Sequence, residues 1–153
     1  MSLPAADPIR LQVTARFVDI LEALVCGEDY WTTPAEVQSW TNPSIELSSY
    51  PTYQVYIEGG NAPENEMGGR FQQEIAVIIK VIDKDNTALV ERLERSRRDI
   101  IKAVMADLEG GAGSLAELAS TIRVDADTVI MGLDGFGSLE QRFLVTLAGK
   151  FSD

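Results

Sequence analysis

An alternating stretch near the middle of the chain constrains the fold most. From residue 71 to residue 82 the side chains alternate between two sets, and the first set is almost wholly apolar: Phe71, Gln73, Ile75, Val77, Ile79 and Val81. Alternation of this kind with many β-branched residues is typical of a strand that turns one face to a core. The second set also holds Ala76, Ile78 and Ile82. We therefore expect that face to be covered by another layer of the chain or by another subunit.

A long amphipathic helix is predicted to follow, over residues 87–108. Its stripe repeats at three- and four-residue spacing: Val90, Leu93, Arg97, Ile100, Ile101, Val104 and Leu108. Asp85 or Asn86 is expected to cap the start of the helix, and the glycines at 110–111 to end it.

Charged residues are expected to fill the other face of this helix, Asp99 among them. Glu91 precedes Arg95 by four residues and Glu94 precedes Arg98 by four, an order that favours ion pairs along a helix. The arginines at 92, 95, 97 and 98 invite a nucleic-acid interpretation. The interleaved acids favour an ordinary solvated helix face instead.

Shorter patterns place the other elements around this centre. A helix is predicted over 8–25, and a capping box from Thr33 to Glu36 predicts a short helix over 34–40. Strands are expected at 45–47 and 53–58, followed by a long acidic loop over 59–69. A helical turn is expected at 114–119, and a second hairpin at 121–131 and 141–147.

The expected fold class is therefore α+β. We predict an antiparallel sheet of about four to five strands, with two long helices on one face and the order α-β-β-α-β-β. Residues 1–153 are expected to form a single domain, with residues 1–6 disordered.

Composition removes several classes of function. The chain has no histidine and one cysteine, Cys26, which we expect to be buried as a free thiol. No apolar run approaches the length of a membrane span and no secretion signal is visible. Aspartates at 125, 127 and 134 lack the calcium-loop pattern, and the glycines at 132–137 lack the dinucleotide pattern. We predict no catalytic residues, no cofactor and no metal. The net charge of −11 disfavours tight binding to nucleic acid.

The order of elements resembles the tail terminator (tail-completion, minor tail) proteins of long-tailed bacteriophages. The resemblance covers nearly the whole chain. It is carried by a leading helix over 8–25, an aromatic linker ending in Tyr50-Pro51, strands at 53–57 and 70–83, the helix over 87–108 and a closing hairpin that ends at 142–147. It is a likeness of size and order without a diagnostic motif.

This resemblance implies a structural protein, not an enzyme, that forms a ring, typically a homohexamer. The ring caps the head-proximal end of the tail tube, stops tube polymerisation and presents a surface for the head-completion or connector protein. The implied partners are other copies of the chain, the tail tube protein and that connector, with DNA passing through the lumen without specific binding and no membrane. The implied location is the virion tail, and the host cytoplasm during assembly.

Interface residues are chosen from pattern, because the family has no motif that assigns them. Tryptophans are enriched at binding hot spots, although both could instead plug one end of the core. The loop acids are expected at an exposed tip, in contact with basic residues of another chain. The candidate interface residues are Trp31, Trp40, Asn61, Glu64, Glu66, Ile78, Arg95 and Arg98.

Three other classes remain open from sequence. The first is another phage neck or tail component, such as a head-closure or tube protein. The second is a ferredoxin-like enzyme or small-ligand domain, which would need a pocket with converging polar groups. The third is an acidic adaptor that mimics DNA. Dense surface acids favour that class, and the arginine-bearing helix disfavours it.

The predicted phase of the central strand can be tested by one substitution. Ile79→Asp would place an unpaired charge in the core, so we expect the chain to lose cooperative folding. Thermal unfolding followed by circular dichroism measures this. A normal unfolding transition in the variant would mean that the strand phase is shifted by one residue.

Overall fold

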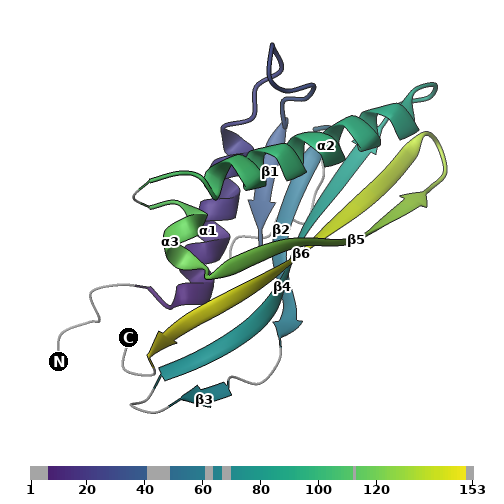
Figure 1. The fold of residues 1–153 in the computed structure, drawn as a ribbon. Coiled ribbons are helices and arrows are strands. Elements are labelled where there is room, and N and C mark those ends of the chain that lie inside the picture. Colours follow the sequence, from purple (N-terminus) through teal and green to yellow (C-terminus); the bar gives the residue numbers. More distant parts are fainter. Residues whose placement is uncertain (1–6, 41–48, 61–63, 67–69, 112, 151–153) are drawn as a thin grey trace.

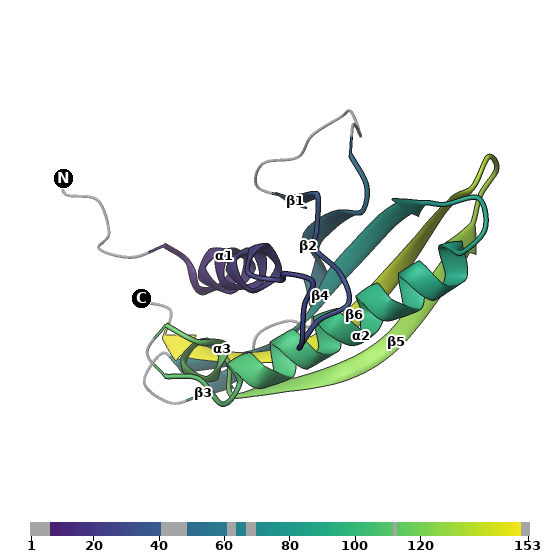
Figure 2. The same cartoon turned by 90° about the horizontal axis from the view of Figure 1, so that it is seen from above.

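The computed structural model describes residues 7–40, 49–60, 64–66, 70–111 and 113–150. Two strands of fifteen residues, β4 (Arg70–Lys84) and β6 (Phe136–Lys150), pair antiparallel over their whole length, from Arg70↔Lys150 to Lys84↔Phe136. On the two flanks lie β2 (Thr52–Gly60) and β5 (Thr121–Met131), both antiparallel to their neighbours. These long strands form the body of a strongly twisted sheet (Figures 1 and 2).

The sheet is completed by two short strands. β1 (Glu36–Ser39) adds to the free side of β2, and β3 (Glu64–Glu66) pairs with the start of β4. The order across the sheet is β1-β2-β4-β6-β5, so β1 and β5 are its edges. β1 runs parallel to β2, which makes the sheet mixed and corrects the purely antiparallel sheet expected from sequence.

Helices α1 (Ile9–Glu22) and α2 (Leu89–Asp107) cover one face of the sheet, and α3 (Leu115–Leu118) closes one end. This confirms the α+β class and the two long helices on one face. The predicted inner face of β4 is also correct, since Ile75, Val77, Ile79 and Val81 are wholly buried. Phe17 of α1 meets Phe143 of β6 in this core, with ring centroids 5.8 Å apart.

The helix predicted over 34–40 is wrong, because these residues form β1. Ala35 N–H donates to Pro51 O and Trp40 N–H to Val55 O, so backbone bonds to β2 hold the segment extended at both ends. Thr33 Oγ1 accepts a hydrogen bond from Cys26 N–H and does not cap a helix. Pairing with β2 outweighs the local capping signal at Thr33.

The long helix is rotated relative to the predicted stripe. Its buried residues are Leu89, Leu93, Ser96, Asp99, Ile100, Ala103 and Val104. Val90, expected in the stripe, is 55% exposed, whereas Asp99, expected in solvent, is wholly buried. The helix begins at Leu89, and Asp85 accepts hydrogen bonds from the N–H groups of Thr87 and Ala88 in the turn before it.

Three further expectations need correction, and a fourth is not tested. Trp31 and Trp40 are 55% and 42% exposed, so neither plugs the core, and Cys26, which follows α1, is also exposed. Glu64 and Glu66 lie in β3, not at an unpaired loop tip. No described helix lies over the second face of β4, where Ile78 is only 3% exposed, so the expectation of cover by another subunit stays a prediction. The strand expected at 45–47 lies outside the described residues.

The predicted hairpin at the end of the chain is confirmed. The interruption expected near 125–127 is a register shift between Val124 and Asp127, and β5 continues on both sides of it. Asp134 and Gly135 both have positive φ, 58° and 77°, as a tight Asp-Gly hairpin turn requires. No helix of the described chain is long and apolar enough to cross a membrane.

Three helices are joined at one ion pair. Arg16 of α1 donates from Nε to Asp107 Oδ2 of α2 at 3.0 Å and forms a second bond through its Nη2. Asp107 Oδ2 also accepts from Leu115 N–H at the start of α3, at 2.8 Å. The hydrogen bonds from Arg16 and, after them, from Leu115 hold the pKa of the Asp107 carboxyl below its ordinary 3.8, although its burial opposes this shift.

Acid should therefore weaken this junction. Because the folded-state pKa of Asp107 is lowered, its stabilising contribution is complete above about pH 4 and is lost as the pH falls through the lowered value. We expect Asp107→Asn to cost about 1–3 kcal/mol at pH 7 and to flatten the decline in stability below pH 4. Urea unfolding between pH 2.5 and pH 7 measures both. Asp134→Asn, in the exposed turn, is the matched control and should keep the wild-type pH profile. If the stability of Asp107→Asn declined below pH 4 as steeply as that of the wild type, the acid sensitivity would not come from Asp107.

Candidate partner-binding site on helix α2

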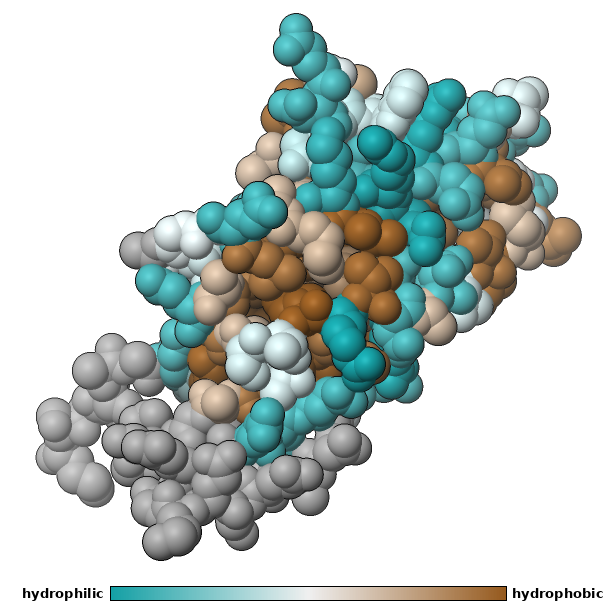
Figure 3. Space-filling model, in the orientation of Figure 1, coloured by the Kyte–Doolittle hydropathy of each residue, from teal (hydrophilic) through white to brown (hydrophobic). Residues whose placement is uncertain are grey.

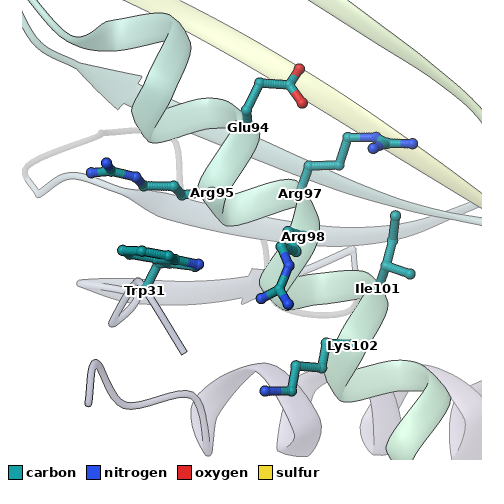
Figure 4. A pocket seen from close by; sticks show the side chains of 7 residues that line it. All are labelled: Trp31, Glu94, Arg95, Arg97, Arg98, Ile101 and Lys102. Carbon is teal, nitrogen blue, oxygen red and sulfur yellow. The ribbon is translucent and has the colours of Figure 1, made fainter. Parts of the chain in front are cut away.

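Three of the eight predicted interface residues come together in one hollow on the outer side of α2. Trp31, Arg95 and Arg98 line it, with Glu94, Arg97, Ile101 and Lys102 (Figure 4), and its volume is about 600 Å³. We call it the basic hollow. Four of its seven residues carry positive charge at neutral pH, in a chain whose net charge is −11.

Helical spacing explains why the α2 residues converge. Residues three, four and seven apart lie on one side of an α-helix, so the side chains of Arg95, Arg98 and Lys102 project in neighbouring directions. In Figure 4 the charged ends of Arg98 and Lys102 point to the side of α2 on which Trp31 lies. All three cations are exposed.

Asp99 of α2 holds the 31–32 segment, which forms the opposite wall of the hollow. Its Oδ2 accepts hydrogen bonds from Trp31 N–H at 2.9 Å, Thr32 N–H at 2.8 Å and the Thr32 hydroxyl at 2.7 Å. The Asp99 side chain is wholly buried, and its Oδ1 has no hydrogen-bond partner among the described residues. A buried carboxylate with three donors holds the backbone of the 31–32 segment against the helix.

Tyr53 supports this clamp from the sheet. Its hydroxyl lies 2.9 Å from the Thr32 hydroxyl, and the tyrosine is wholly buried. Burial raises the pKa of Tyr53, the Ser96 and Thr32 hydroxyls near it oppose this shift, and the charge of Asp99 adds to it. Tyr53 therefore stays neutral under ordinary conditions and keeps the proton that a hydrogen bond to Thr32 needs.

Sequence reasoning missed Asp99, Thr32 and Tyr53 as parts of this site. The signal available was the row Ser96, Asp99 and Ala103, small or short polar residues at helical spacing. Such a row marks the line where another segment can approach a helix closely. The stripe predicted through Val90 and Arg97 is more hydrophobic than this row, so the pattern favoured the wrong face of the helix.

Two exposed cations of the hollow, Arg95 and Lys102, are held by aromatic rings and not by carboxylates among the described residues. The Arg95 guanidinium lies over the Trp31 ring, 4.9 Å from its centroid. Lys102 Nζ lies 5.2 Å from the centroid of the Tyr30 ring and donates to the Asp29 carbonyl at 2.7 Å. None of the ion pairs between described residues joins Arg95, Arg98 or Lys102 to a carboxylate.

The expected ion pairs from Glu91 to Arg95 and from Glu94 to Arg98 are therefore wrong for the described chain. Arg97 is different from its neighbours, because its Nε donates to Gln141 Oε1 at 3.0 Å and lies 3.6 Å from Asp127 Oδ1. It braces α2 against β6 and β5. The free cations of the hollow are thus Arg95, Arg98 and Lys102.

The other predicted interface residues do not join the hollow. Trp40 follows β1, and its Nε1 donates to Thr14 Oγ1 of α1 at 3.1 Å. Ile78 lies on the opposite face of the sheet and is nearly buried within this chain. The side chains of Glu64 and Glu66 and the whole of Asn61 lie outside the described structure.

The hollow offers charge and an aromatic surface. Three exposed cations beside a half-exposed indole ring can bind an anionic group and stack on a flat or apolar one. The described residues contain no cluster of acidic or cysteine ligands that could hold a metal ion.

Comparison with known proteins finds a likeness among solved structures. No family model matches the chain, and no curated protein matches it. A chain from the solved structure described as "Virion of native gene transfer agent (GTA) particle" matches with a TM-score of 0.49 and 12% sequence identity, over 92% of each chain. A likeness at this identity and TM-score says nothing about the activity or partners of the present chain.

The clamp at Asp99 can be tested directly. In Asp99→Ala, the N–H groups of Trp31 and Thr32 lose their acceptor, so we expect a loss of about 2–4 kcal/mol in the free energy of unfolding. Amide exchange of both residues should speed up, and acrylamide should quench tryptophan fluorescence more strongly. Glu94→Ala removes an exposed carboxylate five residues earlier on the same helix and should leave the free energy of unfolding, the amide exchange and the quenching unchanged. Unchanged amide protection in Asp99→Ala would contradict the clamp.

Proposed function

We propose that this chain is a non-enzymatic structural protein of a phage-like virion. Its proposed role is that of a tail terminator, which forms a ring on the head-proximal end of the tail tube, stops polymerisation and offers a surface to the head connector. The proposal rests on the resemblance in size and element order, and on surfaces that a single copy leaves uncovered.

The observation that carries the proposal is edge strand β5. It is eleven residues long, and nearly all of it is exposed. Four of its large apolar side chains are at least 40% exposed: Val124, Val129, Ile130 and Met131. Leu133, in the turn that follows, is 85% exposed. Hydrophobic atoms are visible at this end of the molecule in Figure 3.

A long apolar edge strand is a template for pairing with another chain. Monomeric proteins blunt such edges with charges or cover them. Here the charges of β5, Arg123, Asp125 and Asp127, lie in its first part, and the residues from Thr128 to Met131 carry none. The opposite edge, β1, has only four residues, so the two edges of the sheet differ. Unlike edges favour a head-to-tail contact between copies, and contacts of that kind close into rings when the rotation permits.

The charge of the chain also fits this role. A ring around passing DNA should not bind it tightly, and a net charge of −11 repels the phosphate backbone. The proposed partners are other copies of the chain, the tube protein and a connector, in the virion tail. The second candidate is another neck or tail component, such as a head-closure or tube protein, which would use the same edge for different contacts.

Light scattering on a size-exclusion column, over a range of protein concentrations, tests the ring. We expect a species several times the monomer mass, with an open lumen in negative-stain images of the leading peak. Ile130→Asp should shift that species toward monomer, because a charge would enter the proposed contact. Val25→Asp, at a 64% exposed position away from β5, is the control and should assemble normally.

Two outcomes would contradict this proposal. The first is a wild-type chain that stays monomeric at every concentration, because the β5 edge would then close no ring. The second is a ring that Ile130→Asp leaves intact while circular dichroism shows both proteins folded. In that case the subunit contact would lie elsewhere.

A further inference from the structure

We propose that the basic hollow docks an acidic peptide segment of another virion protein. Such a segment would present two carboxylates to Arg95, Arg98 and Lys102, and an apolar or aromatic side chain to Trp31. This inference rests on the proposed function for the kind of partner, an assembly protein. The chemistry of recognition rests on the hollow itself.

Unpaired charge is the first argument. Arg95, Arg98 and Lys102 lie within two helical turns, and no described carboxylate neutralises any of them, although the chain has eleven more acidic than basic residues. Glu94 lines the same hollow without pairing to Arg98. Three like charges held this close favour an external anion.

The dimensions fit a peptide. Arg95 and Lys102 are seven residues apart, which is about 10 Å along a helix. Alternate side chains of an extended peptide lie about 7 Å apart, so two carboxylates on one side of a strand can reach this row together. The volume of about 600 Å³ also lies within the range of ordinary ligand sites.

The walls of the hollow are already fixed. Asp99 holds the backbone of Trp31 through a fully buried carboxylate, and Arg95 lies over one face of the indole. Trp31 nevertheless remains 55% exposed. An exposed aromatic ring that is rigidly held provides binding area at low entropic cost.

A protein carboxylate fits better than a nucleic-acid phosphate. Glu91 and Glu94 are exposed on the same helix as the three cations, so a continuous phosphate backbone crossing the hollow would meet negative charge beside it. The net charge of the whole chain adds to that repulsion. A short acidic peptide can place its charges on the cations alone.

Binding of an N-acetylated hexaglutamate amide, measured by isothermal titration calorimetry on the intact chain, tests the inference. We expect binding that weakens with added salt, and at least tenfold weaker binding in Arg95→Gln/Arg98→Gln. Arg123→Gln removes an arginine that is 65% exposed on β5 and should change the affinity less than twofold. Hexaglutamine is the uncharged control peptide.

Trp31 supplies a second readout. In a Trp40→Phe background, hexaglutamate should change the fluorescence of the one remaining tryptophan, and the double arginine variant should abolish the change. A twelve-base-pair DNA duplex and inorganic phosphate are titrated in parallel and should bind at least tenfold more weakly than the peptide.

Three results would overturn the inference: equal binding of hexaglutamine, wild-type affinity in Arg95→Gln/Arg98→Gln, or tighter binding of the duplex or of phosphate. Light scattering on the same samples separates this inference from the ring. Peptide binding by a chain that never forms a ring would support the docking site and contradict the terminator role. A ring that does not bind the peptide would support the terminator role and contradict the docking site.

Discussion

The antiparallel pairing of β4 with β6 is the constraint on which the rest of the molecule depends. Fifteen residue pairs fix the register, and a shift of one residue would turn every side chain to the other face. With this register, Ile75, Val77 and Ile79 of β4 lie on the same face as Phe143 and Val145 of β6, and all five are wholly buried. That apolar surface gives α1 and α2 their place. The position of α2 in turn decides which of its charges reach solvent.

Buried or nearly buried aspartates then fix the helices and loops more finely than apolar contact alone. Asp83, only 1% exposed, accepts two hydrogen bonds of 2.8 Å from Arg92 and so ties the end of β4 to the first turns of α2. Asp99 fastens the 31–32 segment at the middle of the helix, and Asp107 fastens α1 and α3 at its end. Each carboxylate finds donors from another element, which offsets the free-energy cost of its burial. Together they set the rotation of α2 about its own axis.

The contrast between apolar packing in the strands and buried aspartates on the helix explains what the sequence could predict. Strand phase depends on alternation with a period of two, so the inner face of β4 and the inward residues of the last hairpin follow from pattern alone. The rotation of α2 depends on Asp99, a charged residue whose partners come from residues 31 and 32, and no helical pattern contains them. β1 was missed for a related reason. Thr33 and Glu36 carry a local capping signal, while the strand exists through its pairing with β2. Trp31, Arg95 and Arg98 were chosen separately, and only the fold brings them together.

The two surfaces proposed for assembly differ in chemistry and in position. Strand β5 is an edge of the described sheet and exposes apolar side chains at Val124 and from Val129 to Met131, which suits backbone pairing between identical copies. The basic hollow lies on the outer side of α2 and is lined with cations, which suits a partner of opposite charge. Because this chain has a net charge of −11, it would repel another acidic protein overall, whereas the cations of the hollow would attract it locally. Such an arrangement would restrict where a partner can dock, because attraction at the hollow is combined with repulsion from the net charge.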